Sequence, residues 1–289
     1  MLPIWKRFAD GFVFNLNDNT DETASYLKKV RNEFNILDVL EHTTKHGELV
    51  IETDRRQALL NAALRYSNKI ICLDADEYLD GVVTKEQLSN LLTQNKETLF
   101  YLEWLQYTGA NKIRVDGPWK NNWKDRIGVY DENPKYPIAQ KHSYHLPPGK
   151  KQIAIEKDFL FISHTAWIDK KYAAVKQYYW KVDDYTNKHL HNIKTYSAAD
   201  YDTSVNNFNW EEIKIDYKCK IPENFFEKIN YAKYYKLKEI EFLKTKYKIP
   251  NLGDWGYGIH DSTLYKESLE SYIKQLEKKL KGIIELCNY

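Results

Sequence analysis

The sequence predicts an α/β fold with a mainly parallel sheet, because strand-like and helix-like segments alternate near its start. Short apolar runs at 11–16, 36–40 and 69–73 have the length and composition of strands. Segments 22–34 and 54–66 lie between them and have helical composition. This alternation is typical of a parallel sheet covered by helices, in which ligands bind beyond the carboxyl ends of the strands.

The middle of the chain has a more mixed pattern. Segment 85–94 has helical composition, and 98–107 resembles a strand. The stretch 109–126 has the composition of a loop, and a further strand is expected over 158–163. A helix is then predicted over 170–184.

The composition changes near residue 185, so we expect an α/β domain over 1–185 and a mainly helical region over 186–289. In the second region, apolar residues at helical spacing predict a helix over 225–247. A second apolar seam, with steps of four and three, runs over 269–283. It is too short for an independent coiled coil, so it either packs on the body of the protein or pairs with a second copy in a homodimer.

Charge and cysteine content exclude several classes of protein. The 43 Lys and Arg residues nearly balance 41 Asp and Glu residues, so no nucleic-acid partner is expected. Three widely spaced cysteines make a disulfide framework or zinc cage unlikely to form and favour a reducing, cytoplasmic location. No apolar run is long enough for a transmembrane segment.

The strongest chemical signal is the acidic turn Asp74-Ala75-Asp76-Glu77, which follows the strand at 69–73. In an extended chain, Asp74 and Asp76 point to the same side. Two such oxygen ligands, with Glu77 behind them, suit Mg²⁺ or Mn²⁺, which could neutralise a diphosphate. The alternative is a solvated acidic turn. Three carboxylates at the end of a buried strand favour a compensating cation or hydrogen-bond donors.

This stretch resembles the family 2 glycosyltransferases, which have the GT-A fold. The family pattern contains an Asp-rich turn, an Arg-containing helix, a strand with an acidic signature, and later positions occupied by Arg and His. The corresponding segments here are 17–23, 54–58, 74–77, 126–130, 141–143 and 162–167. The resemblance covers roughly residues 1–185 and implies a nucleotide-sugar-binding catalytic domain. Its fold would be a Rossmann-like mixed sheet flanked by helices, followed by a helical C-terminal region.

The resemblance implies a metal-dependent, inverting glycosyltransferase that moves a sugar from a nucleotide sugar, most simply a UDP-sugar, to a hydroxyl of a glycan or glycoconjugate. Mn²⁺ or Mg²⁺ would be held by Asp74, Asp76 and His164. The nucleotide sugar would contact Asn17, Asp21, Arg55, Arg56, Asp74 and Arg126. The candidate bases for the acceptor hydroxyl are Asp125, Glu103 and Glu77, which the sequence does not separate.

Two departures from the family pattern keep other functions open. Residues 2–5 resemble a helix, so the family's opening strand is expected to be missing or displaced. Two expected acids are replaced, by Asn17 and Ser143. One alternative is therefore a non-catalytic or degenerate GT-A-like protein that binds nucleotides or glycans. Another is a nucleotidyltransferase, against which the lack of a Gly-rich phosphate loop counts. Taken alone, His164 suits a core or surface histidine equally well, and Arg55 and Arg56 suit a solvated helix face.

Overall fold

A computed structural model defines the fold of most of the first two thirds of the chain. It describes residues 1–17, 19, 21–43, 52–109, 112–116, 119–137, 144–167, 170–191, 210–212, 240–241, 244–246 and 248. The chain divides into two compact units. The first comprises residues 1–165 and 210–220, and the second comprises residues 166–209 and 221–289.

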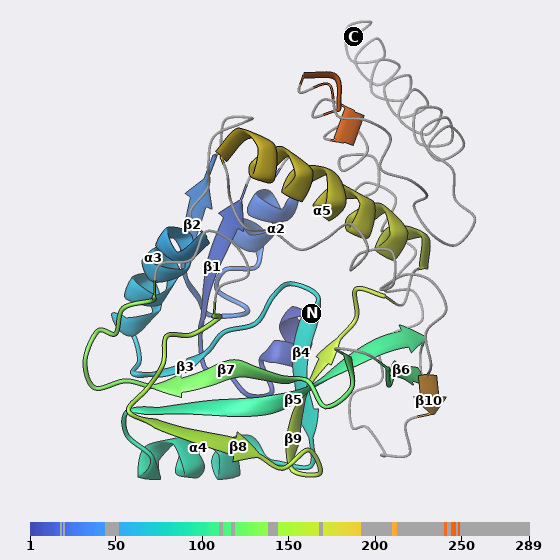
Figure 1. Cartoon of the computed structure of the whole chain (residues 1–289). Helices are drawn as coiled ribbons and strands as arrows, with labels where there is room; N and C mark the ends of the chain where they lie inside the picture. Colours follow the sequence, from blue (N-terminus) through green and yellow to red (C-terminus); the bar gives the residue numbers. More distant parts are fainter. Residues whose placement is uncertain are drawn as a thin grey trace, which may run out of the picture. The chain divides into compact units, whose positions relative to one another are not determined.

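The first unit begins with two parallel strands and two short helices. Helix α1 (Leu2–Trp5) precedes β1 (Phe12–Asn17), and α2 (Thr23–Lys29) connects β1 to β2 (Ile36–His42). The two strands pair in parallel and form a sheet of their own (Figure 1). Their shared apolar core consists of Leu2, Phe12, Leu16, Leu27, Phe34 and Ile36.

Helix α3 (Glu52–Leu64) and strand β3 (Lys69–Ile71) continue the alternation up to the acidic turn. The predicted order of strand, helix, strand, helix and strand is therefore confirmed. Strand β3 ends before the predicted strand does. A further strand, β4 (Glu77–Gly81), starts within the predicted acidic turn and was not expected from the sequence.

The second sheet is built around the long strand β5 (Thr98–Gly109). Its other members are β3, β4, β6 (Lys112–Arg114), β7 (Trp123–Val129), β8 (Lys151–Ile155), β9 (Leu160–His164) and β10 (Trp210–Glu212). Among all strand pairs that the structure describes, five are antiparallel and three are parallel. The fold is thus mixed α/β, and the prediction of a mainly parallel sheet is wrong. Short returns such as the one from β5 to β6 impose antiparallel pairing.

The sequence also misplaced two parts of this sheet. The stretch 109–126 was expected to be a loop, but it contains β6 and the start of β7. Strand β8 was not predicted, because its residues are mostly exposed and its apolar pattern is short. The strand expected over 158–163 is confirmed as β9, with its last residue at His164.

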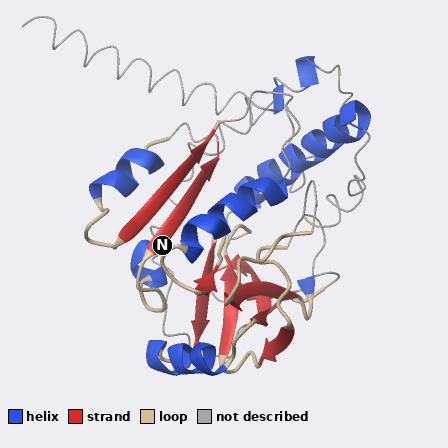
Figure 2. Ribbon diagram, turned by 90° about the vertical axis from the view of Figure 1, so that its left-hand side faces the viewer, coloured by secondary structure: helices blue, strands red, loops and turns tan. Residues whose placement is uncertain are grey.

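Successive side chains of β5 belong to two different cores, as the alternation of a strand requires. Phe100, Leu102 and Trp104 pack with the apolar side of α4 (Lys85–Gln94). Leu99 and the half-buried Tyr101 belong instead to the cluster that includes Leu60 of α3. Helices therefore cover both faces of the sheet, and Figure 2 shows α4 across one end of it. A capping box at Thr84 begins α4.

The second unit is described mainly through α5 (Lys170–His191), which confirms and extends the helix predicted over 170–184. Val175, Tyr178 and Val182 are buried at helical spacing. Most of the helix predicted over 225–247, and all of the seam at 269–283, lie outside the described residues. None of the helices within the described part is both long and apolar enough to cross a membrane.

Gly81 is the residue at which the pairing of β4 with β9 is most sensitive to a side chain. Its φ of +140° is open to glycine alone, and an added Cβ would lie 2.4 Å from the carbonyl oxygen of Phe159. We expect Gly81→Ala to lower the free energy of unfolding by about 2 kcal/mol or more. Urea titration checks this, with Ser89→Ala on the exposed face of α4 as control. Equal stability of the two variants would contradict the steric role given to Gly81.

Candidate functional site

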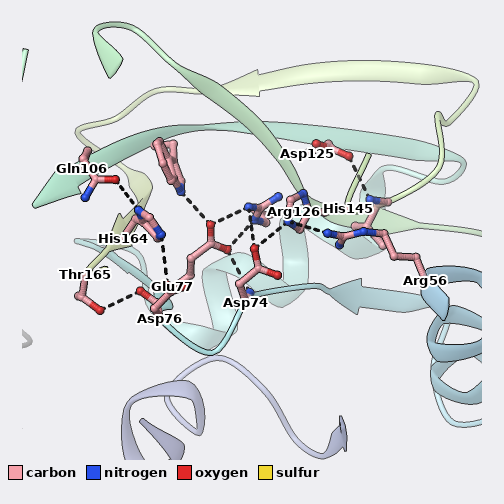
Figure 3. Close-up of polar contacts among 12 residues, drawn as sticks. Arg56, Asp74, Asp76, Glu77, Gln106, Asp125, Arg126, His145, His164 and Thr165 are labelled. Carbon is pink, nitrogen blue, oxygen red and sulfur yellow. Dashed lines mark hydrogen bonds and ion pairs between the residues drawn. The ribbon is translucent and has the colours of Figure 1, made fainter. Parts of the chain in front are cut away.

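The carboxylate of Glu77 lies at the centre of a buried polar cluster (Figure 3). Arg126 donates to both of its oxygens, from Nε at 2.8 Å and from Nη2 at 2.6 Å. Trp104 Nε1 donates to Oε1 at 2.8 Å, and the backbone N–H of Asp74 donates to Oε2 at 3.1 Å. Each oxygen thus accepts two hydrogen bonds, which fills the acceptor capacity of the carboxylate.

Arg126 is bound to Glu77 and is buried away from the surface. It is 1% exposed, and the β-bulge opposite Phe100 and Tyr101 lies at its position in β7. Burial alone would lower the pKa of Arg126, but the Glu77 carboxylate outweighs it and raises the pKa. Only Nη1 of its guanidinium has no hydrogen-bond partner among the described residues. Because Nη1 is sealed from solvent, a diphosphate does not reach Arg126 directly in this structure.

Asp74 belongs to a second layer of charges beside this pair. Its side chain is half exposed, and its Oδ2 lies 2.9 Å from His145 Nε2 and 3.8 Å from Arg126 Nη2. Arg56, which is bound to Glu52, lies with Nη2 3.3 Å from the same histidine nitrogen. Burial would raise the pKa of Asp74, but His145, Arg126 and Arg56 together hold it well below its usual range. Asp74 is therefore an anion with an exposed side at any ordinary pH.

Asp76 points to a different partner. Its Oδ2 lies 3.5 Å from His164 Nε2, at the end of β9. His164 Nδ1 contacts Gln106 Oε1, and its ring stacks on Trp104 with centroids 4.3 Å apart. Since an amide oxygen only accepts, Nδ1 carries a hydrogen, and Nε2 faces Asp76. The N–H and hydroxyl of Thr165 donate to the Asp76 carbonyl, which fixes this end of the turn.

Asp74 and Asp76 do not point to the same side, because the residues between them are not extended. The N–H of Glu77 donates to the Asp74 carbonyl at 3.0 Å and closes a tight turn. The turn sends the three acidic side chains to three separate partners. The expectation of two parallel carboxylates is therefore corrected.

Asp76 and His164 fit a divalent cation as a pair of ligands. Mg²⁺ and Mn²⁺ sites that act on phosphates combine one or two protein ligands with water and phosphate oxygens. A metal-binding histidine usually donates its other ring N–H to an oxygen acceptor, and His164 has such an acceptor in Gln106 Oε1. Within the described residues, no group of three His, Cys, Asp or Glu side chains has the arrangement of a complete metal site. Two of the three predicted ligands are thus together, whereas Asp74 faces His145.

Asn17 and Asp21 lie at the carboxyl end of β1, in the two-stranded sheet rather than in the sheet that carries Glu77. Asn17 is exposed and stands opposite His42. The Asp21 carboxylate accepts the N–H of Thr23 at 3.0 Å and so helps to start α2. Arg55 is half-buried on α3, next to Arg56.

The other two candidate bases, Glu103 and Asp125, lie on the opposite face of β5 from Trp104. Glu103 precedes Trp104 in β5, so its side chain points to the other face. Asp125 pairs with Tyr101, which is two residues before Glu103 and therefore on the same face as Glu103. Both acids are buried. Asp125 accepts the N–H of Leu146 at 3.0 Å.

Comparison with models of known protein families, with curated proteins and with solved structures finds no match. The site is therefore interpreted from its own residues and geometry.

Several residues of the cluster were not found from the sequence. His145 lies 71 residues from Asp74, and Gln106 lies 58 residues from His164. No local motif marks either of them. Trp104 had a weak signal, because a buried tryptophan needs a partner for its N–H. Lys124 was also missed: its Nζ lies 5.4 Å from the Trp104 ring centre, and burial followed by Arg126 lowers its pKa.

Removing one partner of the buried Glu77–Arg126 pair should strongly destabilise the fold. Arg126→Met leaves a buried carboxylate without its main donor, so we expect a loss of about 3–5 kcal/mol in the free energy of unfolding. Arg65→Met is the matched control, because the ion pair of Arg65 with Asp38 is solvent-exposed and should contribute about 1 kcal/mol or less. Urea denaturation measures both. A loss of the same size in the two variants would contradict the role given to the pair.

Asp74 should make stability depend on acid pH. Its folded pKa is lowered, so its contribution is complete above the unfolded pKa of about 4 and is lost as the pH falls toward the folded value. We expect the difference in urea midpoint between wild type and Asp74→Asn to be constant from pH 7 to 5 and to shrink below about pH 4. Asp10→Asn, at an exposed carboxylate, gives the baseline. A difference that grows in acid would have the wrong sign.

Proposed function

We propose that this protein is a metal-dependent, inverting glycosyltransferase of the GT-A type, which uses a nucleotide-sugar donor. The observation that carries the proposal is the meeting of Asp76 and His164, 3.5 Å apart, beside the anionic Asp74 turn. Sequence-distant residues that converge in this way at strand ends are typical of ligand sites in α/β proteins.

The order of elements before Asp74 supports the same proposal. Strands β1, β2 and β3 alternate with α2 and α3, so on this proposal β1 is the family's opening strand. From the sequence alone, that strand was expected to be missing or displaced. Asn17 then stands at the end of the first strand. The segment 44–51, which follows β2 in the sequence, takes the place that 17–23 had in the sequence analysis, and it lies outside the described residues.

Each residue of the site has a defined part in this proposal. A cation bound by Asp76 and His164 would neutralise the negative charge of the departing nucleoside diphosphate. Gln106 and Trp104 hold the His164 ring in position. Asp74 has an exposed carboxylate and can accept hydrogen bonds from ribose hydroxyls.

Two cations are placed to attract the diphosphate. Arg56 lies beside Asp74 and His145, and against the effect of burial its pKa is raised by Cys72, Asp74 and Glu52. The side chain of Lys124 makes no hydrogen bond or ion pair with the residues that the structure describes, so its ammonium is available to a phosphate. Arg126 contributes less, because Glu77 occupies most of its guanidinium.

In the proposed reaction, the acceptor hydroxyl oxygen forms a bond to the donor sugar carbon as the bond from that carbon to the diphosphate oxygen breaks. The hydroxyl proton passes to a carboxylate base. Glu77 is poorly suited to receive it, because both of its oxygens already accept two hydrogen bonds. The base is therefore Glu103 or Asp125.

Calorimetric titration of UDP and GDP, with and without Mn²⁺, tests the nucleotide site. We expect binding that requires Mn²⁺ and that weakens at least about tenfold, or 1.4 kcal/mol, in Asp76→Asn. Glu132→Gln, at an 80%-exposed carboxylate, is the matched control and should bind like wild type. Failure of both nucleotides to bind, or binding that is indifferent to Mn²⁺ and to Asp76, would overturn the proposal.

Product analysis separates the remaining alternatives. A panel of nucleotide sugars incubated with Mn²⁺ should release a nucleoside diphosphate slowly to water, and Asp76→Asn should abolish the release. Release of pyrophosphate would indicate a nucleotidyltransferase. Metal-dependent binding without any release, even with glycan acceptors present, would indicate a non-catalytic binding protein.

A further inference from the structure

One face of the β5–β7 strand pair carries two recessed acids whose hydrogen-bonding capacity the fold leaves unused. Glu103 stands opposite Trp123, and Asp125 stands opposite Tyr101, so the four side chains share the face that lies away from Trp104. Glu103 is 9% exposed and Asp125 is 6% exposed. Acidic side chains are almost never this buried unless they are paired, so this degree of burial is unusual.

Neither carboxylate is satisfied by the protein. The Glu103 side chain makes no hydrogen bond or ion pair with any residue that the structure describes. Asp125 uses one oxygen, Oδ2, which accepts the N–H of Leu146. The Glu103 oxygens and the other Asp125 oxygen, Oδ1, are not among the unpaired atoms that are sealed from solvent, so each acid reaches the surface. A partly dehydrated carboxylate without a donor is costly, and a ligand that brings hydroxyl donors would offset that cost.

Exposed aromatic rings accompany these acids. Trp123 is 39% exposed and Tyr144 is 51% exposed, both high values for large aromatic side chains. Tyr101 lies close enough to Asp125 and Tyr144 for both to affect it: burial, then the charges of Asp125 and Tyr144, raise the pKa of its hydroxyl. Flat rings beside hydrogen-bond acceptors suit a ligand with one apolar face and a polar rim, which describes a sugar ring.

This face is connected directly to the Asp74 turn. Leu146 donates to Asp125, and the preceding residue, His145, contacts Asp74. Two adjacent residues therefore join the recessed acids to the carboxylate that faces the nucleotide in the proposed function. A sugar on this face would lie next to the donor site, as an acceptor must.

We propose that Glu103, Asp125, Trp123 and Tyr144 form the acceptor site, and that its ligand is a neutral saccharide. This inference rests on the proposed function. The rings stack on the apolar face of the saccharide, and the two carboxylates accept hydrogen bonds from its hydroxyls. Saccharides that carry carboxylate or sulfate groups are disfavoured, because two recessed anions repel them.

Binding to an array of defined neutral, amino-substituted and anionic oligosaccharides, followed by titration of the bound ones, tests this site without any donor. We expect neutral glycans to bind and anionic ones to be excluded. Trp123→Ala and Glu103→Gln should each weaken binding about tenfold or more, because each removes a ring contact or a charged acceptor. The matched controls are Tyr26→Ala, at an aromatic side chain that is 49% exposed on α2, and Glu132→Gln. Thermal melting verifies that each variant is folded.

The outcomes distinguish this inference from the proposed function. Nucleotide binding that requires Mn²⁺, together with glycan binding that is absent or unchanged in both variants, would overturn the acceptor site alone. Glycan binding that is lost in both variants supports a saccharide site at these residues, even if no nucleotide binds and the proposed function, and with it the acceptor role, fails. Preferential binding of anionic glycans, or of a lysine-rich control peptide, would also overturn it.

Discussion

The structure around the site depends on one buried carboxylate, that of Glu77. Burying Glu77 and Arg126 costs several kcal/mol per charge in lost hydration, which their mutual attraction and the full set of hydrogen bonds to the Glu77 carboxylate offset. That bonding comes from separate parts of the chain: Arg126 on β7, Trp104 on β5, and the N–H of Asp74. Trp5 of α1 adds a bond to the backbone carbonyl of Glu77. The acidic turn therefore has its geometry set by the interior and not by solvent.

This constraint explains why three neighbouring acids have three different environments. Glu77 is held inside, and the turn closed between Glu77 and Asp74 leaves the other two carboxylates on diverging paths. Asp74 then faces a cationic group of side chains, whereas Asp76 faces the imidazole of His164. A carboxylate surrounded by cations suits the polar groups of a nucleotide, and a carboxylate beside an imidazole nitrogen suits a metal ion. Because Glu77 is fixed, Asp74 and Asp76 are held apart and can contact different groups.

Local patterns predicted what depends on local energies. The helix at 85–94 and the alternation up to Asp74 follow from propensity and apolar spacing, and the structure confirms them. Strand direction was mispredicted, because pairing around β5 depends on which distant segments return to it. The turn geometry was missed because an extended chain was assumed between Asp74 and Asp76. His145 and Gln106 were missed because their roles arise only from contacts across the fold.

The alternation of β5 places different chemistry on its two sides. Trp104 and Gln106 point to the face that supports His164. Glu103 and Tyr101 point to the other face. The Asp74 turn lies at the edge of this strand layer, and His145 and Leu146 connect it to the acids of the far face. The Asp76–His164 pair and the recessed acids Glu103 and Asp125 therefore lie on different sides of this strand layer, and they do not compete for the same cation. Transfer between two substrates needs this separation, since a base bound to the metal would lose its affinity for the acceptor proton.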